Sequence, residues 1–472
     1  MAKPARRSGL IQLTSRGRRR RLIPFIEGDS PIMISNDNET LASAAPSTSS
    51  PQRKAAIALA ILTVTNLLNY YDRTLIVVVS QPLRDEFNLT DTQYGLLAGP
   101  AFVLVYALSS LVFGWLADRH NRRTIICSAL AAWSIMTALV GLAQSFALLA
   151  LARAGVGVGE GGANPAGMSL LSDHYPPVRR TFALAIYTAG GMFGLFLSFV
   201  LGSWIAVQYG WRAVFIVAAI PGLILALCGL LLLSEPPRGR FETTPPQLFS
   251  YREGLQRLRA NRAFVWGCSA AAMGTFGSLG MVIWLPQFFI RTHGLTVQQI
   301  GLYFGPTAAL GLFAGVIAGG MIGSRMARTS LAEPLILCVV ANFTLIPLYL
   351  LALWSPNLPL ALVLTFAAMA ISTSYSPAFL AAVQNICEPS TRGTASAVCN
   401  VVIAIIGQGL LPLSIGVVSD ALAPVAGAAS LRWALTISTG FMLISGLLFI
   451  TTLRLSVRHY AAANPLASAI QE

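Results

Sequence analysis

The sequence predicts an all-α membrane protein with about twelve transmembrane helices arranged as two six-helix bundles. Of its 472 residues, 55% are hydrophobic and only 11% are charged, whereas a soluble domain has about 25% charged residues. About twelve apolar segments are long enough to span the roughly 30 Å hydrocarbon core of a bilayer. An internal repeat divides these segments into two sets of six.

One long polar connection separates the two sets. Residues 235–261 contain two Pro-Pro pairs and an amphipathic basic piece that starts at Tyr251. Because prolines stop helices, this segment is expected to link the bundles. The expected domains are a tail at 1–54, bundles at 55–234 and 262–456 around the linker, and a tail at 457–472. The expected spans are 55–80, 92–117, 124–144, 147–173, 180–207, 212–234, 262–291, 297–324, 332–353, 359–386, 391–420 and 431–456.

Residues 1–54 are polar and are expected to form a disordered basic cytoplasmic tail. Four consecutive arginines at 18–21 precede a stretch rich in Ser, Thr, Ala and Pro between Leu41 and Gln52. Such a composition cannot bury enough apolar surface to fold. The arginines would be solvated or contact anionic lipid. Alternatively, translation starts at Met33 and residues 1–32 are not made.

The formal charge of +14 indicates membrane topology rather than nucleic-acid binding. Arginines gather in the even-numbered connections, and Lys and Arg are retained on the cytoplasmic side of a membrane. Both termini are therefore expected to be cytoplasmic, in a multi-pass protein of the inner or plasma membrane. No nucleic-acid motif accompanies the charge. The six cysteines lack metal-ligand spacing, so neither a metal nor a cofactor is expected.

The connection between the second and third segments has a distinctive pattern. Its glycine allows a neighbouring helix to approach closely, and its aspartate can cap a helix or pair with an arginine. The spacing G-x-x-x-D-R-x-x-R-R is similar to the loop between helices 2 and 3 of the major facilitator superfamily. A loop that only sets topology would also be rich in arginine. The similarity implies conformational gating for Gly114, Asp118, Arg119, Arg122 and Arg123.

The two halves of the chain repeat at nearly constant offsets. At a shift of 206 residues, six positions of the second segment and its following loop meet identical residue types, and at 212 four positions around the fourth segment do so. Two parallel six-helix repeats are the basis of the major facilitator fold, with substrate near the midplane. The repeat is asymmetric in charge, because Arg153 falls on Thr365 and Glu160 falls on Ser372.

Four charged residues of the first bundle lie deep within apolar segments. Asp72 and Arg73 belong to the first segment, and Arg153 and Glu160 to the fourth. At 1.5 Å per residue, all four lie roughly 9–20 Å below the outer surface, in one band. Arg153 and Glu160 share a helix face, whereas Asp72 and Arg73 diverge by about 100°. Charges are costly inside a membrane unless they are paired or wetted, so these four should face the bundle interior.

These charges form the predicted site of proton and substrate handling. A carboxylate that alternates between an apolar environment and one beside an arginine takes up and releases a proton. We therefore expect Asp72 and Glu160 to carry protons, and Arg73 or Arg153 to bind an anionic substrate or reset a carboxylate. A static ion-pair network that locks the first and fourth helices is the structural alternative.

Further polar residues would line a substrate cavity between the bundles. Hydrogen bonding between helices explains each of them equally well. The second bundle otherwise offers apolar and hydroxyl surface, and a cavity charged on one wall and apolar on the other suits an amphipathic anion. The expected substrate-binding residues are Arg73, Asn69, Arg153, Tyr106, Tyr187, Ser372, Tyr375 and Asn400.

Three stretches resemble the Spinster-type branch of the major facilitator superfamily. They are Asn-Leu-Leu-Asn-Tyr-Tyr-Asp-Arg at 66–73, the arginine-rich loop at 114–123, and the segment at 153–180 with its Gly-x-Gly-Glu. The resemblance covers most of residues 55–240. In that branch the aspartate and arginine of the first motif and the glutamate of the last are implicated in substrate and proton handling. The resemblance implies these roles for Asp72, Arg73 and Glu160, and the branch includes lysolipid transporters.

The predicted function is alternating-access secondary transport, coupled to protons, of an amphipathic anion such as a lysophospholipid. Its partners would be that substrate, protons and membrane lipid, and a monomer is expected because each chain holds a complete two-bundle pathway. One alternative is a proton-coupled importer of small organic anions, such as sugar acids or aromatic acids. Another is a transport-inactive sensor on the same fold. No ATP-binding loop or hydrolase motif is present, so an enzyme is not expected.

Overall fold

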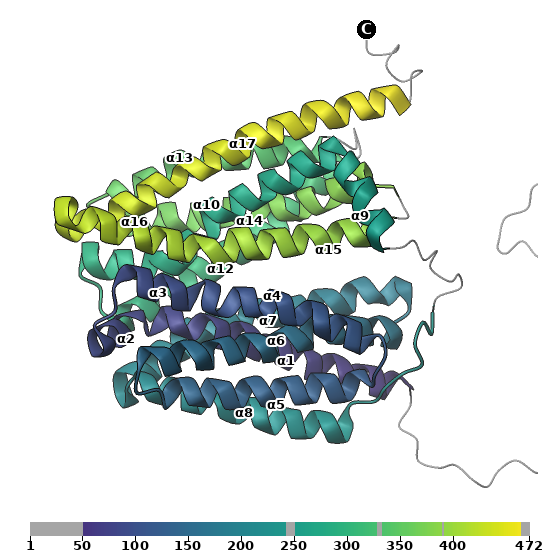
Figure 1. Ribbon diagram of the computed structural model, residues 1–472, viewed down its shortest axis with the longest axis horizontal. Coiled ribbons are helices and arrows are strands. Elements are labelled where there is room, and N and C mark those ends of the chain that lie inside the picture. Colours follow the sequence, from purple (N-terminus) through teal and green to yellow (C-terminus); the bar gives the residue numbers. More distant parts are fainter. Residues whose placement is uncertain (1–50, 242–250, 328–332, 389–390, 464–472) are drawn as a thin grey trace, which may run out of the picture. The chain divides into compact units, whose positions relative to one another are not determined.

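The computed structural model describes residues 51–241, 251–327, 333–388 and 391–463, and its regular structure there is helical throughout (Figure 1). Most of the expected basic tail and the last part of the expected C-terminal tail lie outside these residues. The helix that was expected to start at 55 begins at Pro51. The last helix was expected to end at 456 and continues to Ala463.

The N-terminal half forms one bundle of helices around a common apolar core. The second expected span is divided at Gly99, where the backbone leaves the helical conformation and the following Pro100 offers no N–H. A short amphipathic helix follows the first span. The elements are α1 (Pro51–Val78), α2 (Ser80–Phe87), α3 (Asp91–Ala98), α4 (Pro100–Ala117), α5 (Arg122–Gly141), α6 (Phe146–His174), α7 (Pro177–Tyr209) and α8 (Trp211–Leu232).

The C-terminal half forms a second bundle, reached through a polar connection that contains the amphipathic helix α9 (Tyr251–Ala260). Two of its spans contain π-helical stretches, which frequently occur at functional positions in helices. The elements are α10 (Arg262–His293), α11 (Val297–Gln299), η1 (Ile300–Phe304), α12 (Gly305–Met326), α13 (Pro334–Trp354), α14 (Leu358–Ile386), α15 (Arg392–Val402), η3 (Ile403–Leu410), α16 (Leu411–Ala426), η4 (Gly427–Ala429) and α17 (Ser430–Ala463).

Within the described residues, ten helical stretches are long and apolar enough to cross a membrane. One of the ten, Thr394–Arg458, contains two successive expected spans, which pack against each other as α16 and α17. Helix α1 stands outside the ten, because Asn66, Asn69, Asp72 and Arg73 lower its hydropathy. The arrangement agrees with the expected twelve crossings in two bundles of six.

The internal repeat seen in the sequence reappears as repeated packing. Helix α4 packs on α6 in the first bundle as α12 packs on α14 in the second. Helix α5 packs on α6 and α8, and its counterpart α13 packs on α14 and α17. The helices of the two halves are therefore packed in the same arrangement.

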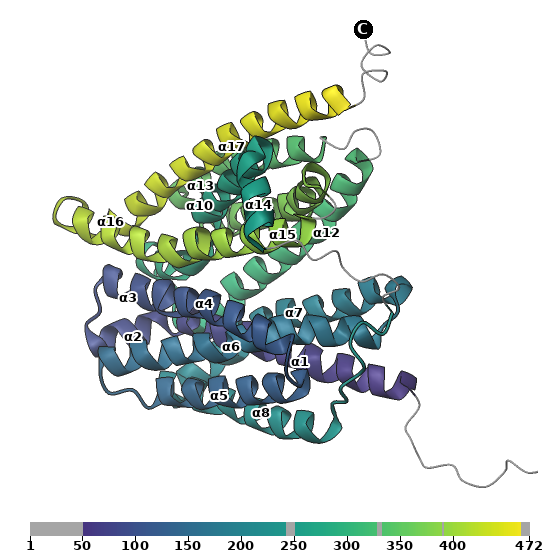
Figure 2. The same cartoon turned by 45° about the vertical axis from the view of Figure 1, so that its right-hand side comes forward.

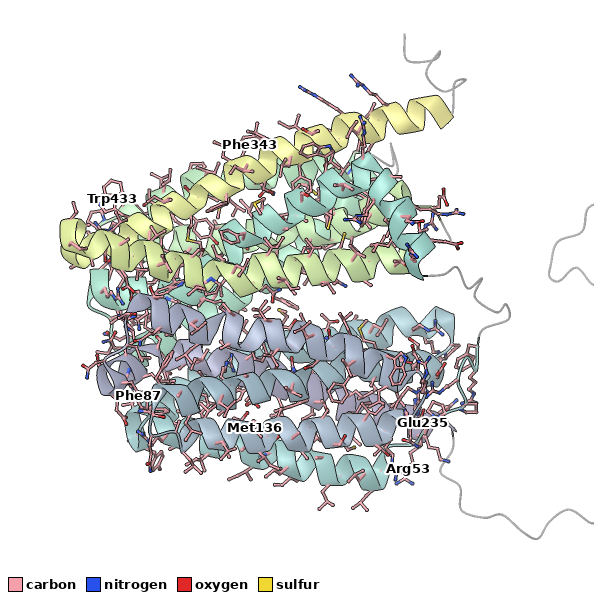
Figure 3. The ribbon with its side chains drawn as sticks, viewed as in Figure 1. Arg53, Phe87, Met136, Glu235, Phe343 and Trp433 are labelled. Carbon is pink, nitrogen blue, oxygen red and sulfur yellow. The ribbon has the colours of Figure 1, made fainter. Side chains whose placement is uncertain are left out.

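The two ends of the bundles are called the linker end and the α2 end. Figure 3 labels Arg53 and Glu235 at one end of the first bundle, which we call the linker end because the connection to α9 starts there. It labels Phe87 at the opposite end, with Trp433 at the same side of the second bundle. We call this the α2 end.

Candidate functional site

A cluster of buried charges joins α1 to α6 inside the first bundle. The side chain of Glu160 is fully buried, and Asp72 and Arg153 are 3% and 2% exposed. Arg73 keeps about a quarter of its side-chain surface exposed, at 26%. The structure thus brings together the four charges that the sequence places in one band of depth.

Arg73 and Glu160 form an ion pair between the first and fourth spans. The Nη2 and Nε atoms of Arg73 donate to Oε2 of Glu160 at 3.1 and 3.4 Å. The other carboxylate oxygen, Oε1, is buried and has no hydrogen-bond partner among the described residues. A buried carboxylate oxygen without a donor is unfavourable, so this site is only half satisfied.

Aromatic rings surround the Arg73 guanidinium. Its central carbon lies 4.7 Å from the ring centroid of Tyr106, 4.9 Å from that of Phe102 and 5.7 Å from that of Tyr70. Phe102 and Tyr106 stack on each other with centroids 5.7 Å apart. Such contacts stabilise a cation by about 0.5–2 kcal/mol when it is desolvated. The guanidinium is therefore held by aromatic faces on several sides as well as by Glu160.

Asp72 points away from the Arg73–Glu160 pair, as its neighbouring position on the helix requires. Its Oδ2 accepts a bond from the Thr137 hydroxyl of α5 at 3.3 Å, and its Oδ1 has no hydrogen-bond partner among the described residues. Arg153 donates to the backbone carbonyl oxygens of Asp72 and Arg73, at 3.5 and 2.9 Å. Arg153 thus holds the backbone of α1 in position and leaves the Asp72 carboxylate without an arginine bond.

The glycines of α6 allow this close contact between helices. A Cβ atom on Gly157 would meet the carbonyl oxygen of Phe102, and one on Gly161 would meet that of Tyr106. A Cβ atom on Gly159 would meet Trp133 of α5. Small residues at such positions let helix backbones approach closely, which agrees with the packing role expected from the sequence.

Two other predicted residues of the first bundle lie beside this cluster. Asn69 is buried one helical turn before Arg73. The Tyr187 hydroxyl donates to Oδ1 of Asn164 at 3.0 Å, and Asn66 donates to the Tyr187 carbonyl at 2.8 Å. Tyr187 is thus engaged in interhelical hydrogen bonds, and its contact with substrate stays a prediction.

The three predicted residues of the second bundle do not assemble with the charged cluster. Tyr375 is buried in the core of its own bundle, where its ring lies 6.0 Å from that of Phe449. Ser372 donates to the Met369 carbonyl of its own helix at 2.8 Å. Asn400 is exposed on α15. The proposed contact of these three residues with substrate stays a prediction.

At the linker end, the predicted gating arginines divide into buried and exposed ones. Arg122 is 1% exposed and donates to Glu235 at 2.7 Å, to Asp173 at 2.5 Å and to Ser169 at 3.0 Å. It also donates to the Pro236 carbonyl at 3.2 Å. Arg122 therefore connects α5, α6 and the segment after α8 within the first bundle.

The other residues of this loop are arranged differently from the expectation. Asn121, and not Asp118, caps α5, by accepting a bond from the backbone N–H of Thr124 at 3.2 Å. Asp118 lies at the end of α4 with its side chain exposed, because the chain needs a further turn before α5 starts. The backbone N–H of Arg123 donates to Glu235 at 3.2 Å.

The surroundings of Arg119 and Gly114 also differ from the expectation. Arg119 is exposed and lies over the Trp115 ring, with its central carbon 4.3 Å from the ring centroid. A Cβ atom on Gly114 would meet nothing within 4 Å. The close helix approach expected at Gly114 is therefore absent, and the same holds for its repeat partner Gly320.

At the α2 end, by contrast, the two bundles are bonded to each other. Arg291 of α10 donates to both carboxylate oxygens of Asp91 at 2.5 and 2.9 Å, and the Ser419 hydroxyl donates to the same carboxylate at 2.6 Å. Asp420 accepts bonds from the backbone N–H groups of Asp91 and Thr92, at 3.0 and 2.8 Å. An anion is favourable at such a helix N-terminus. We call Asp91, Arg291 and Asp420 the α2-end latch.

Close backbone packing accompanies the latch. Helix α3 lies alongside α16 (Figure 2), and a Cβ atom on Gly95 would overlap the Pro412 carbonyl. The Tyr94 and Trp284 rings meet edge to face with centroids 5.0 Å apart. Gln287 donates to the Ser80 hydroxyl at 2.8 Å. The latch was not predicted from the sequence, although Asp91 directly precedes one expected span and Arg291 and Asp420 end two others.

Replacing Asp91 with asparagine is expected to loosen the α2 end. The change removes the negative charge to which Arg291 and Ser419 donate hydrogen bonds. A hydrogen bond to a charged group contributes about 1.5–3 kcal/mol. In a cysteine-free background with Ser80→Cys, maleimide labelling should become about tenfold faster or more. Asp85→Asn is the matched control, because Asp85 is exposed and bonds only locally to Gln81. Equal labelling rates in both variants would contradict a role for the latch.

The comparisons with known proteins agree with this architecture. Residues 62–412 match the model of the Major Facilitator Superfamily. An "MFS-type efflux pump" of Mycolicibacterium smegmatis is 29% identical over 395 residues, which cover 84% of this chain and 91% of the relative. The human "Protein spinster homolog 3" is 32% identical over 406 residues, covering 79% of this chain and 77% of the relative.

A solved structure gives the same result in three dimensions. The crystal structure of a bacterial homologue of the human lysosomal transporter Spinster, described as inward-facing and unoccupied, superposes with a TM-score of 0.79. It is 28% identical and covers 87% of this chain and 99% of its own. A zebrafish relative named "Sphingosine-1-phosphate transporter SPNS2" is 28% identical over 61% of this chain and 60% of its own. The chain therefore belongs to the Spinster-type branch of the major facilitator superfamily, whose members are membrane transporters and not enzymes.

Proposed function

We propose that this transporter is coupled to protons and carries an amphipathic anion by alternating access. The observation that carries the proposal is the buried Arg73–Glu160 pair, in which one oxygen of Glu160 has no hydrogen-bond partner among the described residues. Buried ionisable groups in a membrane are costly and are commonly found on ion pathways. A purely structural pair would be expected to satisfy both carboxylate oxygens.

The proposed mechanism couples a proton on Glu160 to an anion on Arg73. While Glu160 is charged, it occupies the Arg73 guanidinium through two hydrogen bonds. A proton on Glu160 removes the charge attraction, and the guanidinium is then free to bind the substrate anion through its exposed part. Proton and anion thus bind together and move in the same direction. Asp72, whose Oδ1 has no hydrogen-bond partner in the part of the chain that the structure describes, provides a second place for a proton.

The aromatic residues around Arg73 favour an amphipathic substrate. Tyr70, Phe102 and Tyr106 place apolar surface beside a single cation. A substrate with an anionic head and an apolar body, such as a lysophospholipid, would match both. Sphingosine-1-phosphate, after which the zebrafish relative is named, is also an amphipathic anion.

The two ends of the bundles suggest which state is present and how the protein is oriented. The α2 end is latched by Asp91 and Arg291, whereas Gly114 faces open space at the linker end. Arginines are concentrated at the linker end, which favours its placement on the cytoplasmic side. We infer an inward-open state with both termini cytoplasmic, in a monomer of the inner or plasma membrane.

Proton flux in liposomes tests the proposal. Purified protein is reconstituted with an internal pH-sensitive dye, and lysophospholipids and small organic acids are added separately. Internal acidification with the lysophospholipids supports the proposal, and acidification only with the small acids would assign the cargo to that class. Substrate binding without a proton signal would favour a uniporter or a sensor.

Two glycine substitutions test the alternating-access assignment. Gly95→Ala places a methyl group against the Pro412 carbonyl, whereas Gly114→Ala meets nothing in this state. Spin labels at the exposed positions Asn88 and Val425 report the separation of the bundles at the α2 end. Gly95→Ala should shift the label distances to longer values, and Gly114→Ala should not. The reverse result would overturn the assignment of the closed end.

A further inference from the structure

A polar pocket at the α2 end of the second bundle lies apart from the charged cluster. It has a volume of about 240 Å³ and is lined by residues from three connections, namely the end of α10, the turn between α13 and α14, and the start of α17. This volume is below that of typical drug-sized sites, which begin at about 300 Å³. The lining residues are Thr292, His293, Trp354, Ser355, Pro356 and Arg432.

Two nitrogen atoms of the pocket residues are buried without a partner. Nε of Arg432 and Nε2 of His293 have no hydrogen-bond partner among the residues that the structure describes. An arginine Nε always carries a proton and cannot act as an acceptor. A buried donor of this kind costs free energy unless an acceptor occupies the space beside it. The pocket lining contributes no Asp or Glu that would serve.

The pocket walls hold the arginine in place. The central carbon of Arg432 lies 5.3 Å from the Trp354 ring centroid. Trp354 donates from Nε1 to the Thr436 hydroxyl at 3.2 Å, and its ring meets that of Trp433 edge to face at 4.9 Å. An arginine fixed on an aromatic face loses less freedom when it binds a ligand. This arrangement is a preorganised cation with an unused donor.

We propose that this pocket binds a phosphate-type oxyanion. A tetrahedral oxyanion supplies several acceptors to one small polar space, and arginine is the residue best suited to it. The donors are the Arg432 guanidinium, the His293 ring and the Thr292 hydroxyl, which line the pocket. The buried Nε of Arg432 and Nε2 of His293 gain an acceptor when their side chains turn toward the anion. The anion is either a free ion or the headgroup of a lipid. Trp354 and Trp433 are 45% and 43% exposed, as aromatic residues are at a membrane interface.

The proposal is independent of the transport mechanism, because the pocket contains none of the residues assigned to protons or cargo. Purified protein is titrated with inorganic phosphate, with dihexanoyl phosphatidic acid and with dihexanoylglycerol, and tryptophan fluorescence is recorded. At least one phosphate-bearing probe should give a saturable signal, and the neutral glycerolipid should not. Phosphate alone identifies a free oxyanion as the ligand, and phosphatidic acid alone identifies a headgroup.

Arg432→Gln is expected to weaken binding of that probe by about tenfold or more, which is the loss expected for hydrogen bonds to a charged group. Arg454→Gln on the same helix is the matched control, because Arg454 is exposed and far along α17. Its affinity should stay within about twofold of the unmodified protein. His293→Ala provides a second variant if Arg432→Gln does not fold, and it should also weaken binding. Equal binding by the unmodified protein and the pocket variants, or no saturable signal with either phosphate probe, would overturn the proposal.

Discussion

Glu160→Gln is expected to reduce proton-driven accumulation of substrate to the level of protein-free liposomes. Glutamine keeps the shape of the side chain and can still accept a bond from Arg73, but it cannot carry a proton between the two sides of the membrane. Substrate exchange in the absence of a pH gradient should continue, since it needs binding and alternation only. The measurement compares pH-driven uptake with counterflow in the same liposomes.

The fold should survive this substitution. Arg73 retains 26% side-chain exposure and contacts three aromatic rings, so loss of the charge on Glu160 does not leave an isolated buried cation. Size-exclusion chromatography should give the same monodisperse peak as the unmodified protein. Glu86→Gln is the control, because Glu86 is exposed and binds Arg212 and Trp211 at the α2 end.

Full proton-driven uptake by the Glu160→Gln variant would contradict the proposed role of Glu160 in proton coupling. Asp72→Asn would then be the next variant, because Asp72 also has a buried carboxylate oxygen without a hydrogen-bond partner among the described residues. Loss of both uptake and counterflow, with the fold intact, would instead assign Glu160 to substrate binding. The two assays therefore separate a proton carrier from a binding residue.

The sequence predicted most span boundaries to within a few residues because apolar length is a strong constraint in a membrane. The exceptions are the ends of the last two spans, where α16 continues to Ala426 and α17 to Ala463. The sequence also predicted that Arg73 and Glu160 lie at the same depth, because helix rise converts residue number into distance. Which side chains meet at that depth depends on helix rotation. Asp72 and Arg73 could be told apart only in the structure, where one contacts Thr137 and the other Glu160.

The contacts between the two bundles could not be predicted from the sequence pattern. Asp91 and Arg291 are 200 residues apart, and no local spacing relates them. A tyrosine in an apolar span can face a cavity or the core with the same periodicity, so the sequence alone left the surroundings of Tyr375 open; the structure places its ring beside that of Phe449. The π-helical stretch η3 was not predicted either, because π-helices have no clear propensity signal and arise from packing.

In the arginine-rich loop, residues of the same type differ in their structural role because they differ in burial. Arg119, Arg122 and Arg123 are the same residue type within five positions, yet Arg122 alone among them is enclosed by carboxylates of two other segments. A gating role for the whole loop was inferred from resemblance, and it stays a prediction. The structure adds a distinct role for Arg122 in the assembly of its own bundle.

Arg122→Ala is expected to be the most destabilising change in this loop. It removes bonds to Asp173, Glu235, Ser169 and the Pro236 carbonyl. Breaking a buried pair by removing one partner typically costs about 3–5 kcal/mol, because the remaining charges are left without compensation. Here two carboxylates would lose the same cation, and the segment after α8 would lose its attachment to α5.

The effect should appear as a lower midpoint of thermal unfolding in detergent and as a smaller monodisperse fraction. Arg119→Ala is the matched control, since Arg119 is exposed and bonds only to its own helix; its cost should stay below about 1 kcal/mol. Arg122→Lys keeps the charge but cannot reach four acceptors with one ammonium group, so an intermediate loss is expected. If Arg122→Ala unfolds at the same temperature as Arg119→Ala, the buried network contributes nothing to stability.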